Sequence, residues 1–388
     1  MDLASCGSRR RRAPQRAAWL LVLSLMVLSL LLSACSSGDD VAGGDIEPPD
    51  DQSEEPVADP GPEPERRDDV GDEDPGTGLP VPGPGEQIHP LTGLPVLANE
   101  LIWRYTMVAI DNNPRARPQT GMPAADLVYE LPVEGGLTRF LALYRAGRAN
   151  PVGPVRSSRD YFLDLAMEWD AVYAHVGGSP MHYEQVGDTG LIILDDLRGA
   201  AGGGVFWRSS DRRAPHNLYT STVNLRQKID ERNWHETPPD RKPFRFVTPD
   251  QLPEGEPARE LVVFWPGHVR EAVTYTYAEG SGAYLRYLGP DAHIDEASGE
   301  ALQAVSILVQ FVPSRQIPGD EAGRLDVDMV GEGRLMTVTG GQVTEGRWRK
   351  TGRREATAFL DAGGEPVQLL PGQVWVLVVP ERTEVSTR

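Results

Sequence analysis

The first 35 residues constrain this chain more than any other feature, because they decide where everything after them is placed. Five arginines lie between positions 9 and 16, and the run 19–32 is apolar except for two serines. Fourteen helical residues span about 21 Å, less than the ~30 Å hydrocarbon core of a bilayer. Small residues then lead into Cys35. This pattern predicts a lipoprotein signal peptide over 1–35 with Cys35 acylated; the alternative is a membrane anchor with an incidental cysteine.

Cysteine usage follows from this cleavage. The chain has two cysteines, Cys6 and Cys35. Cleavage before Cys35 removes Cys6, and acylation blocks the remaining thiol, so the mature chain forms no internal disulfide. Cysteine nucleophiles and cysteine-ligated zinc are excluded for the same reason. We expect a head tethered to the cell membrane by a diacylglyceryl cysteine, on the extracytoplasmic face.

The segment 36–88 carries most of the negative charge. It has 17 acids and two arginines, against a net charge of -19 for the whole chain. Asp, Glu, Pro and Gly dominate it, and almost no aromatic residue is present. Such a composition cannot bury enough apolar surface to offset the entropy of ordering, which predicts a disordered acidic linker. The overall acidity argues against nucleic acid as a partner.

The segment 89–237 is predicted to fold as a layered α/β domain. Apolar runs at 106–110, 126–130, 139–144 and 171–176 are typical of strands, and 160–170 is typical of a buried helix capped by Ser157 or Ser158. A short helix begins after Ser179, and another begins at 221 or 222. Strands that alternate with helices favour an α/β layer.

A second pattern begins after the proline-rich stretch 238–257. Apolar residues alternate with polar ones around 273–277, and Gly-Gly pairs at 340–341 and 363–364 separate further alternating runs. Short strands with glycine turns predict a mainly antiparallel β domain over 258–385. The fold class predicted for the head is therefore α+β.

Several separate motifs are distinctive. They are 111–119 (DNNPRARPQ), 133–140 (VEGGLTRF), 153–159 (GPVRSSR), 175–179 (HVGGS), 206–208 (FWR), 213–219 (RAPHNLY), 346–350 (GRWRK) and 371–375 (PGQVW). Together they resemble the YerB-like lipoproteins of Gram-positive bacteria over roughly 89–380. The resemblance implies a two-domain extracytoplasmic head on a lipid anchor. It implies no particular reaction, and a role near cell-wall synthesis enzymes follows only by association.

Arg156 and Arg159 form the first candidate binding site, because they precede the predicted helix 160–170. Free backbone N–H groups and two guanidinium groups at one helix end would suit a phosphate or carboxylate. The alternative is local ion pairing. Residues 139–217 contain nine arginines and nine acids, so every arginine has a prospective partner nearby.

Two histidines extend this site. His216 and Asn217 follow Arg213 in a predicted loop, where His216 would serve as a base or a hydrogen-bond donor, or else would only cap neighbouring backbone groups. His175 ends a predicted strand, as Asp111 does. Ligands collect at the carboxyl ends of parallel strands, so we expect these two side chains to face one crevice if the strands are parallel. Three residues after His175 would line the same crevice, namely Gly177, Gly178 and Ser179.

No motif assigns a reaction. The serines lie in no Gly-x-Ser-x-Gly or Ser-x-x-Lys pattern, the histidines lack metal-ligand spacing, and no glycine-rich nucleotide loop is present. We therefore predict no cofactor and no metal. The first functional hypothesis is non-enzymatic binding of an envelope ligand or a wall-synthesis partner, with a purely structural spacer as a further reading.

The second functional hypothesis is an enzyme acting on an anionic envelope substrate. Arg156, Arg159 and Arg213 would hold the anion, with His216 or His175 as general base. Convergence of these side chains within ~8 Å in a concave pocket would favour a small-ligand site, whereas separate salt bridges would favour surface binding.

Overall fold

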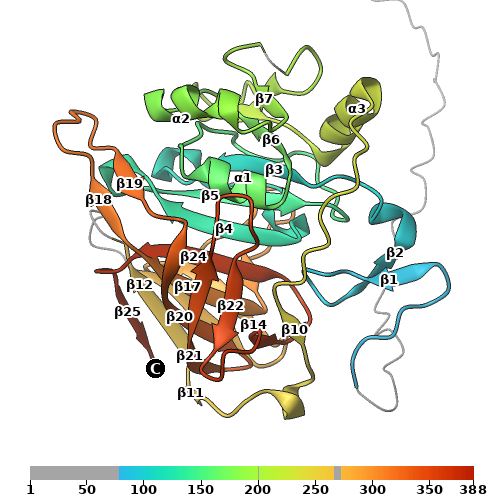
Figure 1. Ribbon diagram of the computed structural model, residues 1–388, viewed down its shortest axis with the longest axis vertical. Coiled ribbons are helices and arrows are strands. Elements are labelled where there is room, and N and C mark those ends of the chain that lie inside the picture. Colours follow the sequence, from blue (N-terminus) through green and yellow to red (C-terminus); the bar gives the residue numbers. More distant parts are fainter. Residues whose placement is uncertain (1–77, 200, 266–271) are drawn as a thin grey trace, which may run out of the picture. The chain divides into compact units, whose positions relative to one another are not determined.

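A long mixed sheet organises the part of the chain that the computed structural model describes, residues 78–199, 201–265 and 272–388 (Figure 1). The predicted signal peptide, Cys35 and nearly all of the predicted linker lie outside these residues. In spatial order the strands are β11 (Glu256–Pro257), β21 (Gln342–Lys350), β20 (Gly331–Thr339), β17 (Ser306–Val312), β24 (Val374–Pro380), β4 (Leu127–Pro132), β5 (Thr138–Tyr144), β3 (Thr106–Asp111), β6 (Val172–His175) and β7 (Ile193–Asp195), with β22 (Ala358–Asp361) paired to β21.

The middle of this sheet is buried on both faces. Strands β3, β4, β5 and β17 are buried at every position. Because both faces of such a strand are buried, its sequence is a nearly continuous apolar run. One face packs against the helix α1 (Phe162–Glu168), all of whose residues are buried. The other face packs against a second sheet.

The second sheet has six strands, and all of its pairings are antiparallel. They are β15 (Asp291–Ala292), β14 (Ala283–Leu288), β13 (Val273–Ala278), β12 (Glu260–Phe264) and β25 (Glu384–Thr387) in order, with β16 (Gln303–Ala304) paired to β14. Tyr275 of this sheet meets Trp375 of the long sheet edge to face, with ring centroids 6.1 Å apart. An antiparallel sheet formed by the C-terminal half of the chain therefore covers one face of the long sheet.

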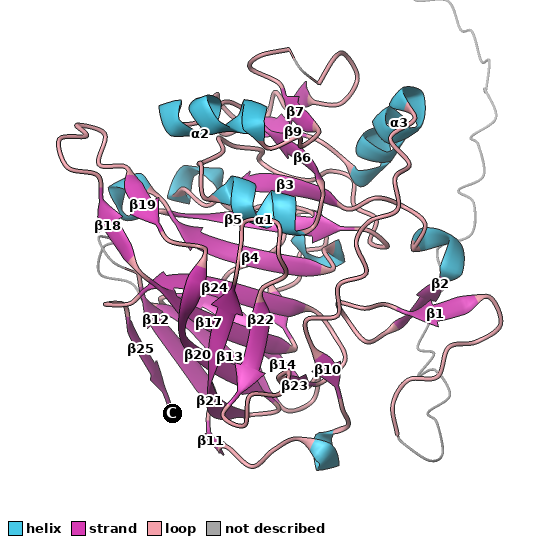
Figure 2. Cartoon of the chain, in the orientation of Figure 1, coloured by secondary structure: helices cyan, strands magenta, loops and turns pink. Residues whose placement is uncertain are grey.

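Strands from both halves of the head share the long sheet. β24 pairs in parallel with β4, with Val374 opposite Leu127 and Leu377 opposite Glu130. The described chain is mostly strand with few helices (Figure 2). The α/β layering expected for 89–237 is not confirmed, because β4, β5 and β3 pair antiparallel and only β3, β6 and β7 run parallel.

The remaining elements are short. Two further helices are α2 (Pro180–Gln185) and α3 (Thr222–Arg232). Two-stranded pairs are β1 (Glu86–Ile88) with β2 (Pro95–Leu97), β8 (Trp207–Arg208) with β9 (Leu218–Tyr219), β10 (Arg245–Phe246) with β23 (Gln368–Leu369), and β18 (Ser314–Gln316) with β19 (Leu325–Val327). No helix within the described residues is both long and apolar enough to cross a membrane.

Serine side chains cap two of the described α-helices, and the cap predicted for α1 is absent. The Ser179 hydroxyl accepts a hydrogen bond from the His182 amide at the start of α2, and Ser221 caps α3 in the same way. No side chain caps α1. The Ser158 hydroxyl instead donates to the Arg159 carbonyl and accepts from the Tyr173 hydroxyl.

Candidate functional site

Asp111, at the end of β3, holds two of the predicted site residues. Its Oδ2 accepts a hydrogen bond from His216 Nδ1 at 2.8 Å and lies 3.3 Å from Arg156 Nε. Asp111 is buried, while the side chains of Arg156 and His216 are 29% and 14% exposed. Because a carboxylate only accepts hydrogen bonds, Nδ1 of His216 is the donor in this contact. We name these three residues the Asp111 cluster.

The segment 153–158 positions Arg156 beside Asp111. Residues 153–158 lie along the end of β3, where the Arg156 amide donates to the Ala109 carbonyl and the Asp111 amide donates to the Pro154 carbonyl, both at 2.8 Å. His216 comes from the loop between β8 and β9. The cluster is thus assembled from three separate segments, which the local sequence pattern does not reveal.

Arg139 is a member of this region that the sequence analysis did not select. It lies on β5 directly opposite Asp111 in the antiparallel register. The side chain is only 5% exposed, Nη1 donates to the Ser157 carbonyl, and Nε has no hydrogen-bond partner within the described structure. Burial, followed by the charge of nearby Arg159, lowers the pKa of Arg139 to about 10. The signal that would have found it is strand register, which needs the paired strand.

Arg159 is occupied by an acid. Its Nε donates to Glu134 at 2.7 Å, Nη2 donates to the second oxygen of the same carboxylate, and Nη1 donates to the Ser158 carbonyl at 2.6 Å. Burial alone would raise the pKa of Glu134, but the Arg159 hydrogen bond and charge outweigh it and lower that pKa. The ion-pair alternative therefore describes Arg159, whereas Arg156 retains a partly exposed guanidinium.

His175 lies apart from the Asp111 cluster. β3 and β6 do run parallel, as the crevice hypothesis required. The segment 153–158 nevertheless lies beside the ends of both strands, since the Val176 amide donates to Arg156 and the Ser158 amide donates to Gly177. His175 is fully buried, and its Nδ1 faces the Gly177 carbonyl at 2.9 Å. The structure does not bring His175 together with Asp111.

The glycines after His175 serve the local turn. Gly177 has a φ of +71° and donates its amide to Asp195 at 2.8 Å. A Cβ at Gly178 would lie 2.5 Å from the His182 ring, so only glycine fits there. With Ser179 capping α2, these residues build the turn between β6 and α2.

The 206–217 loop supplies the exposed part of the region. Arg213 is exposed and makes no ion pair within the described residues. Asn217 is buried and holds the loop, because its side chain accepts from Arg208 at 3.0 Å and donates to the Ser209 carbonyl at 2.9 Å. Arg212 pairs with Glu296 at 2.8 Å.

Positive charge accumulates where these segments meet. Residues 111–118, 156 and 206–217 contain six arginines and two aspartates, in a chain whose net charge is -19. Four grooves on the described surface have volumes of about 620, 390, 290 and 320 Å³, and the Asp111 cluster lines none of them. The groove of about 320 Å³ is lined by the neighbouring Arg117 and Pro118. Within the described residues, no group of three or more His, Cys, Asp or Glu side chains is arranged to hold a metal ion. The arrangement is an open, arginine-rich surface around an Asp–His pair.

Comparisons with known proteins agree on one group of relatives. Residues 91–235 match the family described as "Protein of unknown function (DUF3048) N-terminal domain", and residues 262–376 match the corresponding C-terminal domain. The chain is 30% identical over 297 residues to "Putative lipoprotein YerB" of Bacillus subtilis (strain 168), covering 76% of this chain and 87% of that protein. It also resembles the crystal structure of the YerB protein from Bacillus subtilis, with a TM-score of 0.67 and 28% identity over 78% of this chain and all of that one.

Proposed function

The chain belongs to the DUF3048 family of YerB-like lipoproteins, and from this premise we propose that it is a non-enzymatic binding protein of the cell envelope. In this proposal Cys35 anchors it to the membrane and the head lies on the extracytoplasmic face. The head recognises an anionic envelope ligand through the Asp111 cluster and the arginines around it.

The observation that carries the proposal is the state of Arg139. A buried guanidinium is normally paired with a carboxylate, since an isolated charge is costly to desolvate. Arg139 is buried, lies near two other arginines and forms no ion pair within the described residues. The charges of Asp111 and Glu134 act on it, but they do not offset burial and Arg159, and its pKa is lowered. A bound anion beside Arg156 would supply the missing counter-charge.

The shape of the region favours an extended ligand. The Asp111 cluster lines none of the four grooves described above, and the side chains of Arg156 and His216 are partly exposed. Exposed arginines such as Arg213 and Arg208 can each contact a separate group through the planar guanidinium fork, which matches phosphate and carboxylate oxygens. We therefore propose an envelope polymer with repeated phosphate or carboxylate groups.

The test is a titration of the mature, acylated chain in phosphatidylcholine vesicles with long-chain polyphosphate, followed by the fluorescence of Trp207. Trp207 is 37% exposed and lies one residue before Arg208, whereas Trp169 is buried and donates to the Tyr129 hydroxyl. Trp207→Phe identifies the part of the signal that comes from this residue. Polygalacturonate, a carboxylate polymer, distinguishes the two anion classes.

Arg156→Ala should weaken polyphosphate binding by roughly tenfold or more, corresponding to about 1.5–3 kcal/mol for a charge-assisted hydrogen bond. Arg334→Ala is the matched control, because Arg334 is also a partly exposed arginine paired with one acid, Glu345, at 2.7 Å. Equal affinities for wild type and Arg156→Ala, or equal losses in both variants, would refute the site.

A second function is favoured by the 2.8 Å contact between His216 and Asp111. An aspartate that orients an imidazole is the arrangement of a general base, and the neighbouring arginines would hold an anionic substrate. This hypothesis predicts that incubation with isolated envelopes releases product. His216→Gln would abolish that release, whereas the binding proposal predicts no release from either protein.

A wall-synthesis enzyme is the other occupant considered for the head. Photo-crosslinking from position 213 in intact envelopes separates the two, because a polymer yields heterogeneous adducts and a protein partner yields one defined adduct. A defined protein adduct that survives Arg156→Ala would place the function on protein recognition instead.

A further inference from the structure

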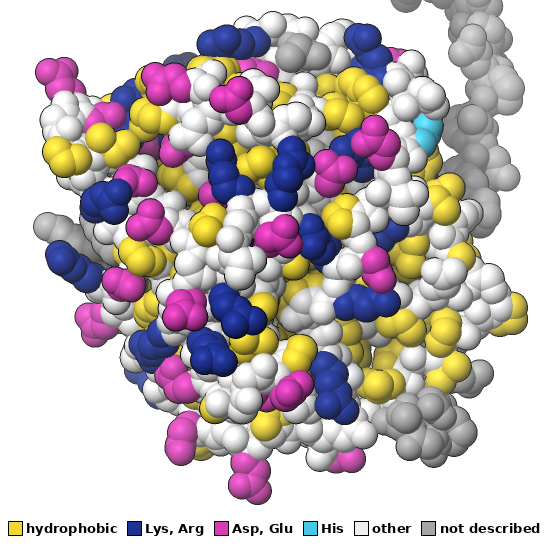
Figure 3. All heavy atoms as spheres, in the orientation of Figure 1, with side chains coloured by type: hydrophobic (Ala, Val, Ile, Leu, Met, Phe, Trp, Pro, Cys, Tyr) yellow, Lys and Arg dark blue, Asp and Glu magenta, His cyan; other side chains and the backbone are white. Residues whose placement is uncertain are grey.

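Exposed apolar side chains are concentrated at the start of the described chain. Of the eleven large apolar side chains exposed in the described residues, five lie between 81 and 102. Ile88, Leu97 and Ile102 are the most exposed of these, at 40%, 52% and 69%. In Figure 3 apolar side chains are concentrated on the side of the molecule where Figure 1 places β1 and β2. Clusters of this kind mark interaction surfaces, whereas scattered single residues do not.

Strand register and a hollow join these residues into one surface. In the β1–β2 hairpin Ile88 is opposite Pro95 and Glu86 is opposite Leu97, so Ile88 and Leu97 project from the same face. Ile88 also lines a groove of about 390 Å³ together with Leu101 and Ile102. We name Ile88, Leu97, Leu101 and Ile102 the hairpin patch.

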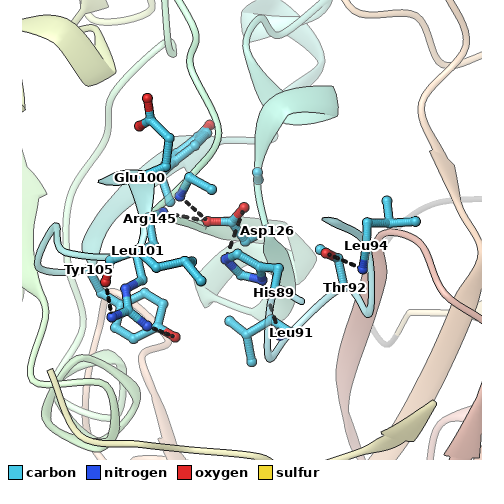
Figure 4. Close-up of polar contacts among 12 residues, drawn as sticks. His89, Leu91, Thr92, Leu94, Glu100, Leu101, Tyr105, Asp126 and Arg145 are labelled. Atoms are coloured by element: carbon cyan, nitrogen blue, oxygen red, sulfur yellow. Dashed lines mark hydrogen bonds and ion pairs between the residues drawn. The ribbon is translucent and has the colours of Figure 1, made fainter. Parts of the chain in front are cut away.

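The hairpin patch is held rigidly on the head, although a two-stranded hairpin alone is marginally stable. Figure 4 shows His89, which follows β1, turned toward Asp126; its Nε2 lies 3.6 Å from the carboxylate, and its Nδ1 accepts from the Leu91 amide at 3.1 Å. His89 and Leu91 are fully buried. The surface is therefore preformed and would cost little ordering entropy on binding.

Arg145 secures the other side of the patch. Its backbone amide donates to the same Asp126 carboxylate, and its guanidinium donates to the carbonyl of Leu101 and to that of Trp103 (Figure 4). These bonds fix the backbone on both sides of Ile102 and leave its side chain exposed. An apolar side chain that the fold holds outward in this way is available to a partner.

The position of the patch in the chain indicates which partner. The described chain begins at residue 78, eight residues before β1, and 42 residues separate Cys35 from that point. At ~3.3–3.6 Å per residue these cannot exceed about 150 Å when fully extended. The hairpin patch thus lies at the start of the described chain, on the side of the sequence that leads to Cys35. We propose that it docks on the lipid bilayer, an inference that rests on the lipid anchor proposed above.

Charge around the patch fits a neutral lipid surface. Lys242 pairs with Asp240 at 3.2 Å, and Arg148 pairs with Glu100. The guanidinium of Arg145, the other cation at the groove, donates to the backbone carbonyls of Leu101 and Trp103. Docking therefore depends on apolar contact, does not require anionic lipids and changes little with salt. The arginine-rich surface around the Asp111 cluster, called the arginine face below, is then distinct from the hairpin patch. The arginine face would bind the ligand, and the hairpin patch would bind the membrane.

The test uses the full acylated chain in phosphatidylcholine vesicles that contain brominated lipid. The mature chain has no free thiol once Cys35 is acylated, so Leu94→Cys and Val330→Cys each accept one nitrobenzoxadiazole label. Leu94 lies in the connection between β1 and β2, directly before β2, and is 39% exposed. Val330 is 40% exposed and lies far along the chain from the hairpin, which makes it a matched control. We expect quenching of the label at position 94 to be at least roughly twofold greater than at position 330.

The variant Leu97→Asp/Ile102→Asp, in the Leu94→Cys background, should reduce quenching to the level at position 330, and its unchanged thermal unfolding midpoint shows that the head is intact. Equal quenching at both positions refutes the proposal, as does full quenching in the aspartate variant. Label self-quenching that rises with protein density would assign the patch to a second copy instead. Failure of the protein to float with vesicles would refute the anchor itself, which is a different result.

Discussion

Two buried arginines, Arg286 and Arg139, differ in whether the fold provides an acid to neutralise their charge. Arg286 on β14 is completely buried and all three of its nitrogens are used, with Nη2 bound to Glu130 of β4 at 2.9 Å and Nε to the Tyr275 hydroxyl at 3.2 Å. Arg139 on β5 is nearly as buried and has no ion-pair partner within the described residues. The charge of the first arginine is neutralised within the fold, whereas we propose that the charge of the second is neutralised by a ligand.

The pKa values of the two side chains follow this difference. Burial acts to lower the pKa of both guanidinium groups. For Arg286 the Glu130 carboxylate outweighs burial and the pKa is raised, whereas for Arg139 burial and Arg159 lower it to about 10. A buried polar network that is complete specifies how two sheets pack, while an incomplete one marks a candidate site.

Removal of Arg286 should have the largest effect on stability. Arg286→Met leaves the Glu130 carboxylate buried without its counter-charge, which costs about 3–5 kcal/mol and lowers the denaturant midpoint of unfolding. The double variant Glu130→Met/Arg286→Met should recover most of this loss, because no unpaired charge remains. Arg334→Ala, which breaks an exposed pair, should cost less than about 1 kcal/mol. Equal losses for Arg286→Met and Arg334→Ala would remove the contrast.

His182 is a third buried titratable side chain, and unlike the two arginines it is neutral at pH 7. His182 is fully buried, neither ring nitrogen has a hydrogen-bond partner, and burial lowers its pKa to about 3, aided by His175. The folded state disfavours protonation, so stability is complete above the unfolded pKa of ~6.5 and decreases as the pH falls toward 3. Between pH 7 and pH 5 the loss from His182 should be about 2 kcal/mol.

Unfolding free energies measured at both pH values check this expectation. His182→Phe should reduce the difference between pH 7 and pH 5, and His235→Gln, at an exposed histidine, should not. An unaltered pH dependence in His182→Phe would show that the ring finds a partner in solution.

The sequence predicts where strands and helices begin and end near these residues, but it does not predict which residues meet across strands and sheets. The ends of β3 at Asp111 and β6 at His175 follow from apolar runs, and the Ser179 and Ser221 caps follow from residue type. Glu130 and Arg286 are 156 residues apart and meet only because two sheets pack together. Arg139 opposes Asp111 only in the observed register of β5 and β3. Strand register and sheet packing depend on long-range contacts, which periodicity does not encode.

Replacement of Arg139 should lower the affinity for polyphosphate without lowering the free energy of unfolding. Arg139→Gln keeps a donor for the Ser157 carbonyl and removes an uncompensated buried charge, so the free energy of unfolding should change by less than about 1 kcal/mol or increase. Affinity for polyphosphate should decrease as it does for Arg156→Ala. A loss of stability as large as that of Arg286→Met would show that Arg139 is structural.

Arg213→Ala should have the smallest effect on folding and therefore isolates the ligand surface. Arg213 is exposed and makes no ion pair within the described residues, so its truncation should change the free energy of unfolding by less than about 0.5 kcal/mol. Its guanidinium adds one cation to the arginine face, and polyphosphate affinity should fall about threefold, more at low salt than at high salt. An affinity that is unchanged at every salt concentration would limit the ligand site to the Asp111 cluster and Arg139, because the exposed loop would then contribute no charge to recognition.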